Sequence, residues 1–420
     1  MQTYRVPTEN LRTKLWHPEQ ISPLKGQPSA LFGLRGLSLT NRLLGYEETT
    51  SHQTYLFYVS ELANLVKENA GDKIRIGEPG AEAAFFRELG ELKGALRYKN
   101  SHHAQSLRNS MLEGEYNGMN FALLALDIAS ELGFLGFKAM YSAGEFGIVA
   151  NEFVFSIENG HCCAMRESGA IYPKMDLIEP AALACLQAGQ YAFQLDDAIS
   201  ETRMKQRISA MAFYSEGLES QPGCRLLHFS RVMHGDSLAM ALRMHGKKSE
   251  AIQLCYQIIS SKQELKSGDS EELINAHLRL GLMEADTESR ENHLLHALEL
   301  IEPAMKLENV QSMQFILNGL QKKQAIALCE IGKIFASQNR KAEASSFFEK
   351  SIAILGSLAT GDDKDNVQWL YYRVDALDEL SKVSPEEQKA GIKGRIEEDK
   401  KTVYDACTKF NIQPAFFAFW

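Results

Sequence analysis

The chain has 420 residues, of which 45% are hydrophobic and 24% charged, and its formal net charge is −9. This length allows two or three domains, and the composition is that of a folded globular protein rather than a disordered one. Acidic and basic residues are mixed along the chain without a basic stripe, so we expect no nucleic-acid partner.

Cysteine usage and the first residues predict a cytoplasmic protein. The seven cysteines have no regular spacing, which favours reduced thiols over a disulfide framework. The N-terminal sequence lacks the basic-then-apolar layout of a signal peptide, and no apolar run approaches the roughly 18 residues that a membrane span needs. We therefore expect no membrane span, while export by a non-classical route stays compatible with the sequence.

The beginning of the chain is expected to form an irregular lead-in and two helices. Residues 1–45 mix prolines and glycines with short apolar pieces, and no function can be read from them. Helical patterns follow over residues 51–69 and 81–96, and an alternating pattern between them, at residues 73–76, is typical of a short strand. No motif in this part calls for a cofactor.

A further helix and a small sheet are expected next. The run after Gly118 has apolar residues on one face and ends at Gly133, which indicates a buried helix. An Asn159-Gly160 turn separates two of the strands that follow. One helix feeding an antiparallel meander predicts an α+β domain over residues 46–202. The predicted strands cover residues 137–142, 152–157, 161–166 and 170–172.

The order of elements over residues 117–177 resembles the core of the transglutaminase-like cysteine hydrolases. In that family a Cys opens the helix, a His begins a strand and an Asp follows, so that an imidazole activates a thiolate and a carboxylate orients the imidazole. The resemblance places Asn120 at the Cys position, Asn151 at the His position and Asp176 at the Asp position. An amide is neither a thiol nor a titratable base, so the mapping implies a catalytically silent domain.

The alternative is an active nucleophile elsewhere in the same domain. His161 and Cys162 are neighbours on a predicted strand and point to opposite faces, whereas Cys163 shares the face of His161 two residues away. His102 or His103 is another candidate base. Cys162 and Cys163 are thus the candidate nucleophiles of a thiol-dependent hydrolase or acyltransferase, set against the interpretation that they are buried structural thiols.

Helical patterns dominate from about residue 203 to the end. Residues 325–355 predict two antiparallel helices, with small residues at Gly332 and Ala344 and a large one at Phe348. This spacing resembles the tetratricopeptide repeat, whose small residues lie where the two helices cross. The resemblance implies an all-α helical-repeat solenoid over residues 203–420; the alternative is a generic helical bundle.

Other parts of this half are less regular. Residues 235–259 and 274–303 look like divergent copies of the same unit, at a wider spacing than the standard repeat. A last pair is predicted over residues 367–380 and 385–409, with a capping box that begins at Ser384. The apolar terminal run PAFFAFW is expected to pack back on these helices as a cap.

The resemblance also implies a binding surface, because ligands of this family usually lie along the first helices of the pairs. That surface is mostly apolar here and lacks the repeated Lys and Asn with which some members hold a C-terminal carboxylate, which favours an amphipathic helix or a mixed peptide. Its residues are Met233, Asp236, Met240, Arg243, Met244, Leu278, Cys329, Lys333 and Ser337.

The function that follows is a protein- or peptide-binding scaffold or regulator, and the alternative is a cysteine hydrolase whose repeats select a protein substrate. Proteins of this two-part build include peptide-sensing regulators and bacterial effectors, an analogy at the level of fold only. His293 and His296 are one helical turn apart and could share a face, and His277 lies in the same repeat, but no Cys or carboxylate completes an evident set of ligands, so no metal is expected.

Overall fold

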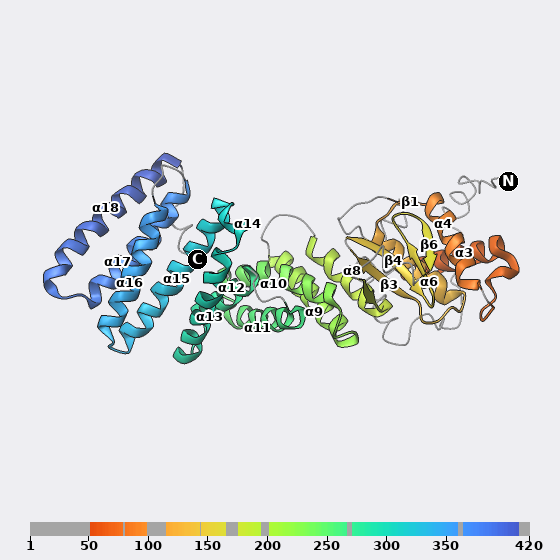
Figure 1. The fold of residues 1–420 in the computed structure, drawn as a ribbon, viewed down its shortest axis with the longest axis horizontal. Helices are drawn as coiled ribbons and strands as arrows, with labels where there is room; N and C mark the ends of the chain where they lie inside the picture. Colours follow the sequence, from red (N-terminus) through yellow and green to blue (C-terminus); the bar gives the residue numbers. More distant parts are fainter. Residues whose placement is uncertain are drawn as a thin grey trace. The chain divides into compact units, whose positions relative to one another are not determined.

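The computed structural model describes residues 51–78, 80–98, 115–142, 144–164, 175–194, 201–266, 271–359 and 364–410 (Figure 1). The lead-in, His102, His103, the strand predicted at residues 170–172 and the PAFFAFW run lie outside these residues. The chain forms two compact units that divide between Arg231 and Val232.

The helices of the first unit match the sequence patterns closely, with one exception. The predicted strand at residues 73–76 is instead the short 3-10 helix η2 (Gly71–Ile74). The backbone of Gly71 is left-handed with φ of 57°, which ends the preceding helix and starts this tight turn. The α-helices of the unit are α3 (Ser51–Ala70), α4 (Ala81–Ala95), α6 (Gly118–Glu131), α8 (Pro180–Gln194), α9 (Glu201–Ser220) and the first residues of α10 (Arg225–Met244).

Five described strands form one antiparallel sheet in the spatial order β6-β5-β4-β3-β7. A second strand pair, β1 (Arg97–Tyr98) with β2 (Glu115–Tyr116), is parallel. The predicted strands at residues 137–142, 152–157 and 161–166 are confirmed within a residue or two, and the Asn159-Gly160 turn joins two of them. The strands of the sheet are β3 (Lys138–Ser142), β4 (Glu145–Ala150), β5 (Phe153–Ser156), β6 (His161–Ala164) and β7 (Asp176–Ile178).

Strand β4 is absent from the sequence prediction, which places no element at residues 145–150. Gly147 lies in the middle of β4 and pairs with Met140 of β3 and Ser156 of β5. A Cβ atom at this position would lie 2.6 Å from the Met140 side chain and 2.7 Å from the Phe155 carbonyl oxygen. The glycine therefore marks a close approach inside the sheet rather than a break in it.

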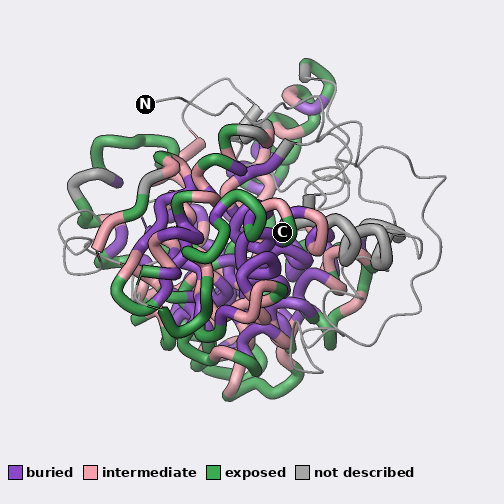
Figure 2. The backbone as a smooth tube through the Cα atoms, turned by 90° about the vertical axis from the view of Figure 1, so that its right-hand side faces the viewer, coloured by how far each residue is buried: buried purple, intermediate pink, exposed green. Residues whose placement is uncertain are grey.

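Aromatic side chains fill the core between the helices and the sheet. Phe86 of α4 stacks on Phe155 of β5 with ring centroids 5.7 Å apart, and Phe85 and Phe137 pack beside them. All but the last of these are fully buried, and Phe137 nearly so. Figure 2 shows the buried residues gathered in the interior, with exposed segments around them. Burial of this apolar surface holds helix α4 against the sheet.

The second unit consists of helix pairs. Three residues join α15 to α16, and such a short connection between two tightly packed helices requires an antiparallel arrangement. Pairs α12–α13 and α17–α18 are built in the same way, and α11 packs on α12. The remaining bounds are α11 (Lys248–Leu265), α12 (Glu271–Met283), α13 (Thr287–Met305), α14 (Glu308–Gln311), α15 (Gln314–Ser337), α16 (Lys341–Leu358), α17 (Lys364–Val383) and α18 (Glu386–Phe410).

Small residues lie where the paired helices approach each other. A Cβ atom on Gly332 of α15 would lie 2.6 Å from the ring of Phe348, which is fully buried in α16. Gly235 of α10 lies in the same way against Ile258 of α11. Consecutive pairs stack on one another, with α13 and α12 against α15, and α16 and α15 against α17. This packing is consistent with a helical-repeat solenoid.

Two local features explain the irregular spacing of the repeats. Between the pairs α12–α13 and α15–α16, the chain includes the short helix α14 and the long first part of the 24-residue α15. Ser384 was predicted to be the N-cap of the last helix. Its hydroxyl instead donates to the Leu380 carbonyl at 2.7 Å, near the C-terminal end of α17. Among the described residues, every helix is too short or too polar to cross a membrane.

Candidate functional site

The two asparagines of the first unit have structural roles. Asn120 is fully buried in the first turn of α6, and its backbone N–H donates to the side-chain oxygen of Asn117, the N-cap, at 2.8 Å. Asn151 lies in the turn between β4 and β5 with φ of 46°, a left-handed conformation that Asn tolerates better than most residues. Its side-chain amide donates to Glu82 of α4 at 2.7 Å. The Asn151 side chain thus fixes a turn, whereas α6 is capped by Asn117, and Asn120 contributes only its backbone N–H to that cap.

The strand register separates Asn151 from Asp176. Val149 of β4 is paired with Lys138 at one end of β3, and Asp176 of β7 is paired with Tyr141 near the other end. Because Asn151 continues two residues beyond Val149, the two positions are about 16 Å apart along the strand direction. Burial raises the pKa of Asp176, and Arg225 opposes that shift. The structure does not bring this carboxyl to Asn151.

Cys162 on β6 lacks the electrostatics of an activated thiol. Cys162 is exposed and Cys163 half-buried. Partial burial of its sulfur and the neighbouring Cys163 raise the pKa of Cys162 to about 11. Activated nucleophiles have a lowered pKa, brought about by a cation, an imidazolium or a helix N-terminus. Near neutral pH Cys162 is therefore almost wholly protonated.

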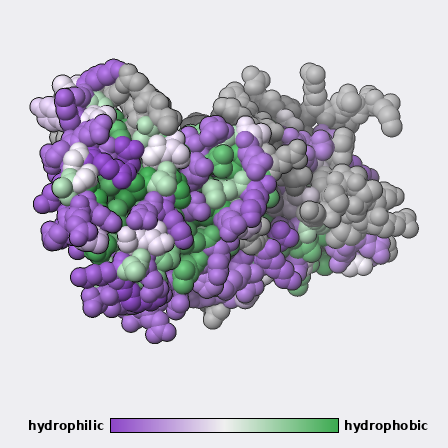
Figure 3. Space-filling view, turned by 60° about the vertical axis from the view of Figure 1, so that its left-hand side comes forward, coloured by the Kyte–Doolittle hydropathy of each residue, from purple (hydrophilic) through white to green (hydrophobic). Residues whose placement is uncertain are grey.

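In the second unit, the first helices of the pairs present an exposed apolar stripe. Met233, Met240 and Met244 lie along one side of α10 and are 42%, 36% and 40% exposed. Leu278 of α12, by contrast, is only 8% exposed and belongs to the core that includes Leu294 and Ile331. Figure 3 shows apolar atoms gathered between hydrophilic borders on the side of the molecule that it brings forward.

Ion pairs connect successive first helices, a feature that sequence reasoning did not anticipate. Arg279 of α12 forms a salt bridge with Asp236 of α10, and Asn275 adds a hydrogen bond to the same carboxylate at 3.3 Å. Lys333 of α15 is 2.9 Å from Asp375 of α17. The surface predicted to be mostly apolar therefore carries charged links between its helices.

Glu330 is the centre of the charged cluster on α15. Its carboxylate accepts from Lys333 at 2.8 Å and from Arg290 of α13 at 3.3 Å. Burial lowers the pKa of Lys333, but the charges of Glu330 and Asp375 outweigh it and raise the pKa overall. Lys333 is consequently a permanent cation held by two carboxylates.

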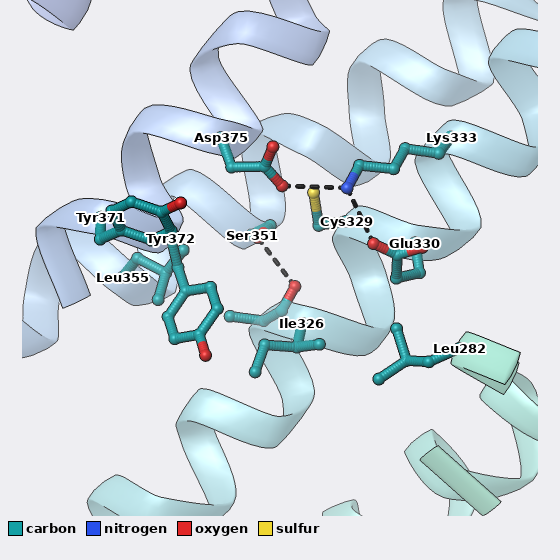
Figure 4. Close-up of a pocket in the computed structure, with 11 residues that line it drawn as sticks. Leu282, Ile326, Cys329, Glu330, Lys333, Ser351, Leu355, Tyr371, Tyr372 and Asp375 are labelled. Carbon is teal, nitrogen blue, oxygen red and sulfur yellow. Dashed lines mark hydrogen bonds and ion pairs between the residues drawn. The ribbon is translucent and has the colours of Figure 1, made fainter. Parts of the chain in front are cut away.

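A pocket of about 210 Å³ lies beside this cluster, between α15, α16 and α17 (Figure 4). Its polar side has Lys333 with its two carboxylates, together with the thiol of Cys329, whose pKa burial raises. Ser351 donates to the Ala325 carbonyl at 2.8 Å and closes the floor. The apolar wall consists of Leu282, Ile326, Leu355, Tyr371 and Tyr372.

Arg243 extends the charged surface to α10. Burial and the charge of Arg279 lower its pKa, while Tyr372 and Glu330 oppose that shift. An arginine on α10 thus interacts electrostatically with groups on α12, α15 and α17. The first helices accordingly contribute to one shared surface. Ser337, at the end of α15, is exposed and donates to the Ile334 carbonyl at 2.6 Å.

The three histidines cluster as the sequence suggested. The Nδ1 atoms of His277 and His293 are 3.1 Å apart, and the rings of His277 and His296 lie 5.4 Å apart. Burial, followed by the charges of His293 and His296, lowers the pKa of His277 to about 4. Within the part of the chain that the structure describes, no group of three or more His, Cys, Asp and Glu side chains is arranged to hold a metal ion.

The structure groups most of the predicted surface residues and adds several others. Asp236, Arg243, Cys329 and Lys333 belong to the charged surface and its pocket, and the three methionines lie along one side of α10, the helix that carries Asp236 and Arg243. The residues missed were Arg279, Glu330, Tyr372 and Asp375, together with the apolar pocket wall. Glu330 could have been found from the sequence, because it lies one helical turn before Lys333. Tyr372 and Asp375 could not, because they lie on α17, which contributed no residue to the predicted surface.

Comparison of the chain with protein-family models and with curated proteins gives no match. The likeness to helical repeats is therefore carried by the crossing glycines and the stacked pairs described above.

Proposed function

We propose that the chain is a protein- or peptide-binding scaffold whose C-terminal, tetratricopeptide-like half holds a partner on its first helices. The observation that carries this proposal is the pocket beside Lys333, which receives side chains from α12, α15, α16 and α17. A pocket of about 210 Å³ is large enough for one apolar or aromatic side chain of a bound segment. Next to it, the exposed methionines of α10 offer adaptable apolar contacts.

The N-terminal α+β domain is catalytically silent in this proposal. Asn120 is buried in the first turn of α6, Asn151 fixes a turn, and Asp176 lies at the other end of the sheet from Asn151. The raised pKa of Cys162 argues against a thiol-dependent hydrolase, which would need a thiolate near neutral pH. The partner-binding half is thus the part that carries the function.

The test compares two sets of charged substitutions in the full chain. Met233→Glu, Met240→Glu and Met244→Glu together place three carboxylates on the first-helix surface. Leu295→Glu with Tyr404→Glu changes exposed apolar residues on the second helices α13 and α18. Peptides selected from a displayed random library on the unmodified chain are then titrated against both variants.

The first variant should lose binding by about 100-fold or more, because each buried carboxylate would be desolvated without a partner. The second should bind like the unmodified chain. Equal binding by both variants, or a greater loss in the second, would show that the partner binds elsewhere. Circular dichroism confirms that both variants are folded.

A further inference from the structure

The carboxylates on the first-helix surface are already paired. Asp236 is held by Arg279 and Asn275, Glu330 by Arg290 and Lys333, and Asp375 by Lys333. These pairs are partly buried, so they are weakly screened and stay formed at physiological ionic strength.

Arg243 is the exception on this surface. It is half-buried on α10, and among the described residues no hydrogen bond or ion pair of normal length reaches its guanidinium. The partial burial of an arginine without a direct ion-pair partner is unfavourable, and the nearby Arg279 adds repulsion that the charge of Glu330 does not outweigh. A ligand that supplies an anion here would relieve both effects.

Tyr372 supplies a second group that would favour an anion. Its hydroxyl is buried without a hydrogen bond of normal geometry, although the Gln368 side chain on the same helix interacts with it. The ammonium of Lys322 lies 5.4 Å from the Tyr372 ring centroid and 5.5 Å from that of Trp369, which makes the local potential more positive. A hydroxyl donor and a guanidinium of this kind match the oxygens of a carboxylate.

We infer that Arg243 and the Tyr372 hydroxyl bind the side-chain carboxylate of an internal Asp or Glu in the partner segment, while a neighbouring apolar residue of that segment occupies the pocket. The inference rests on the proposed function and specifies its ligand. Met240 and Met244, on either side of Arg243, contact the apolar face of the same segment. The partner is accordingly an amphipathic segment with an acidic residue close to an apolar one.

The charges around the site favour a carboxylate over a phosphate. A dianionic phosphate would bring its second charge close to Glu330 and Asp375, which already share Lys333. A chain terminus is disfavoured for another reason. Asn275, an amide that could hold the backbone of a chain end, is engaged with Asp236. One internal side-chain carboxylate satisfies Arg243 without disturbing either pair.

The experiment uses the full chain and a library of 12-residue peptides fused to the display protein through their C-termini, so that no peptide has a free terminal carboxylate. Selected peptides are synthesised with amidated C-termini and titrated by calorimetry. We expect an Asp or Glu at one fixed position, with an apolar residue nearby. Changing this acidic residue to Asn or Gln should weaken the affinity about 10- to 100-fold, because it removes a hydrogen bond to a charged group.

Substitutions on the protein assign the site. In Arg243→Gln the acidic peptide and its amide variant should bind with equal affinity, whereas Arg395→Gln, an exposed arginine on α18, should keep the full difference. Tyr372→Phe should reduce the difference by about 3- to 10-fold, the contribution of one hydroxyl donor. Urea unfolding of Arg243→Gln establishes that it is folded, and no loss of stability is expected because the arginine has no partner to lose.

Several results would overturn the inference and leave the proposed function intact. These are selected peptides without a required acid, or an Arg243→Gln variant that still distinguishes the acid from the amide. A preference for a phosphorylated peptide, or Arg243-dependent binding of acid-free peptides with a free C-terminus, would overturn the assignment to a side-chain carboxylate. If no peptide binds the unmodified chain at all, the proposed function itself fails.

Discussion

The two units place their polar groups in opposite ways. In the first unit, the positions that resemble catalytic residues are used for the fold, since Asn120 lies buried at a helix start and Asn151 fixes a turn. In the second unit, charged groups are kept on the surface of the first helices, where they hold one helix to the next and leave Arg243 without a partner. Resemblance of sequence pointed to chemistry in the first unit. Pairing of charges points to recognition in the second.

The packing of the helix pairs gives the largest expected effect. Phe348→Ala removes a fully buried ring at the crossing with Gly332 and should destabilise the second unit by about 3–5 kcal/mol. Hydrogen exchange with mass spectrometry measures each unit separately. Gly332→Ala should be tolerated better when Phe348 is replaced by Leu than when the ring is present. Independence of the two substitutions would show that these helices do not cross at Gly332.

The buried ion pair between α17 and α18 is next in size. Arg373 holds Asp399 with two hydrogen bonds, and the side chain of Asp399 is only 6% exposed. Arg373→Ala leaves that carboxylate buried without its cation and should cost about 3 kcal/mol in urea unfolding. Arg373→Met together with Asp399→Leu should recover most of the loss. A loss of stability as small as that of a surface ion pair would mean that water reaches the Asp399 carboxylate in the variant.

The histidine cluster predicts that acid lowers the stability of the second unit. The first unit does not contain these histidines, so its stability should not change for this reason. Burial and the charges of His293 and His296 hold the pKa of His277 at about 4, below its usual value of 6.5. The folded state therefore binds fewer protons than the unfolded state in this range. Stability is complete above pH 6.5 and declines as the pH falls towards 4, by about 1–2 kcal/mol after solvent screening is allowed for.

Urea midpoints measured between pH 7.5 and 4 check this prediction. His277→Gln should flatten the curve in that window, and the residual slope reflects His293, whose pKa burial also lowers. His245→Gln, at an exposed position outside the cluster, is the matched control and should change the slope less. A curve unchanged by His277→Gln would mean that other groups set the acid sensitivity.

Asn151 gives a smaller effect that separates a turn residue from a catalytic one. Asn151→Ala should cost about 1 kcal/mol, because alanine disfavours the left-handed φ of 46° and loses the hydrogen bond to Glu82. Asn151→Gly also removes the hydrogen bond, but glycine adopts the left-handed backbone conformation without strain, so this variant should lose less stability. Equal losses in the two variants would assign the whole effect to the hydrogen bond.

The smallest expected effect is on the reactivity of Cys162. With its pKa at about 11, alkylation by iodoacetamide should be slow at pH 7 and should accelerate about tenfold per pH unit up to pH 10. The buried cysteines, modified only in urea, provide the reference. A rate that levels off below pH 8 would reveal a thiolate and would restore the hydrolase alternative.

Helix positions and the crossing residues could be predicted from the sequence, because apolar periodicity and the Gly332 to Phe348 spacing are local properties. Strand β4 could not, since Gly147 is explained only by the approach of Met140 and Phe155 from neighbouring strands. The same limit applies to the site. Met240, Arg243 and Lys333 follow from helical period, but the pairing that leaves Arg243 alone depends on which helices become neighbours.

The exposed methionines of α10 have a chemical consequence of their own. Oxidation converts a thioether to a sulfoxide, which is polar, chiral and reversible by dedicated reductases. Because Met233, Met240 and Met244 are all substantially exposed, peroxide reaches them without unfolding the chain. The surface proposed to receive the apolar face of a partner would then become polar at three points. Partner binding should accordingly weaken under oxidative conditions and return after enzymatic reduction, so the stripe ties recognition to the redox state of its surroundings.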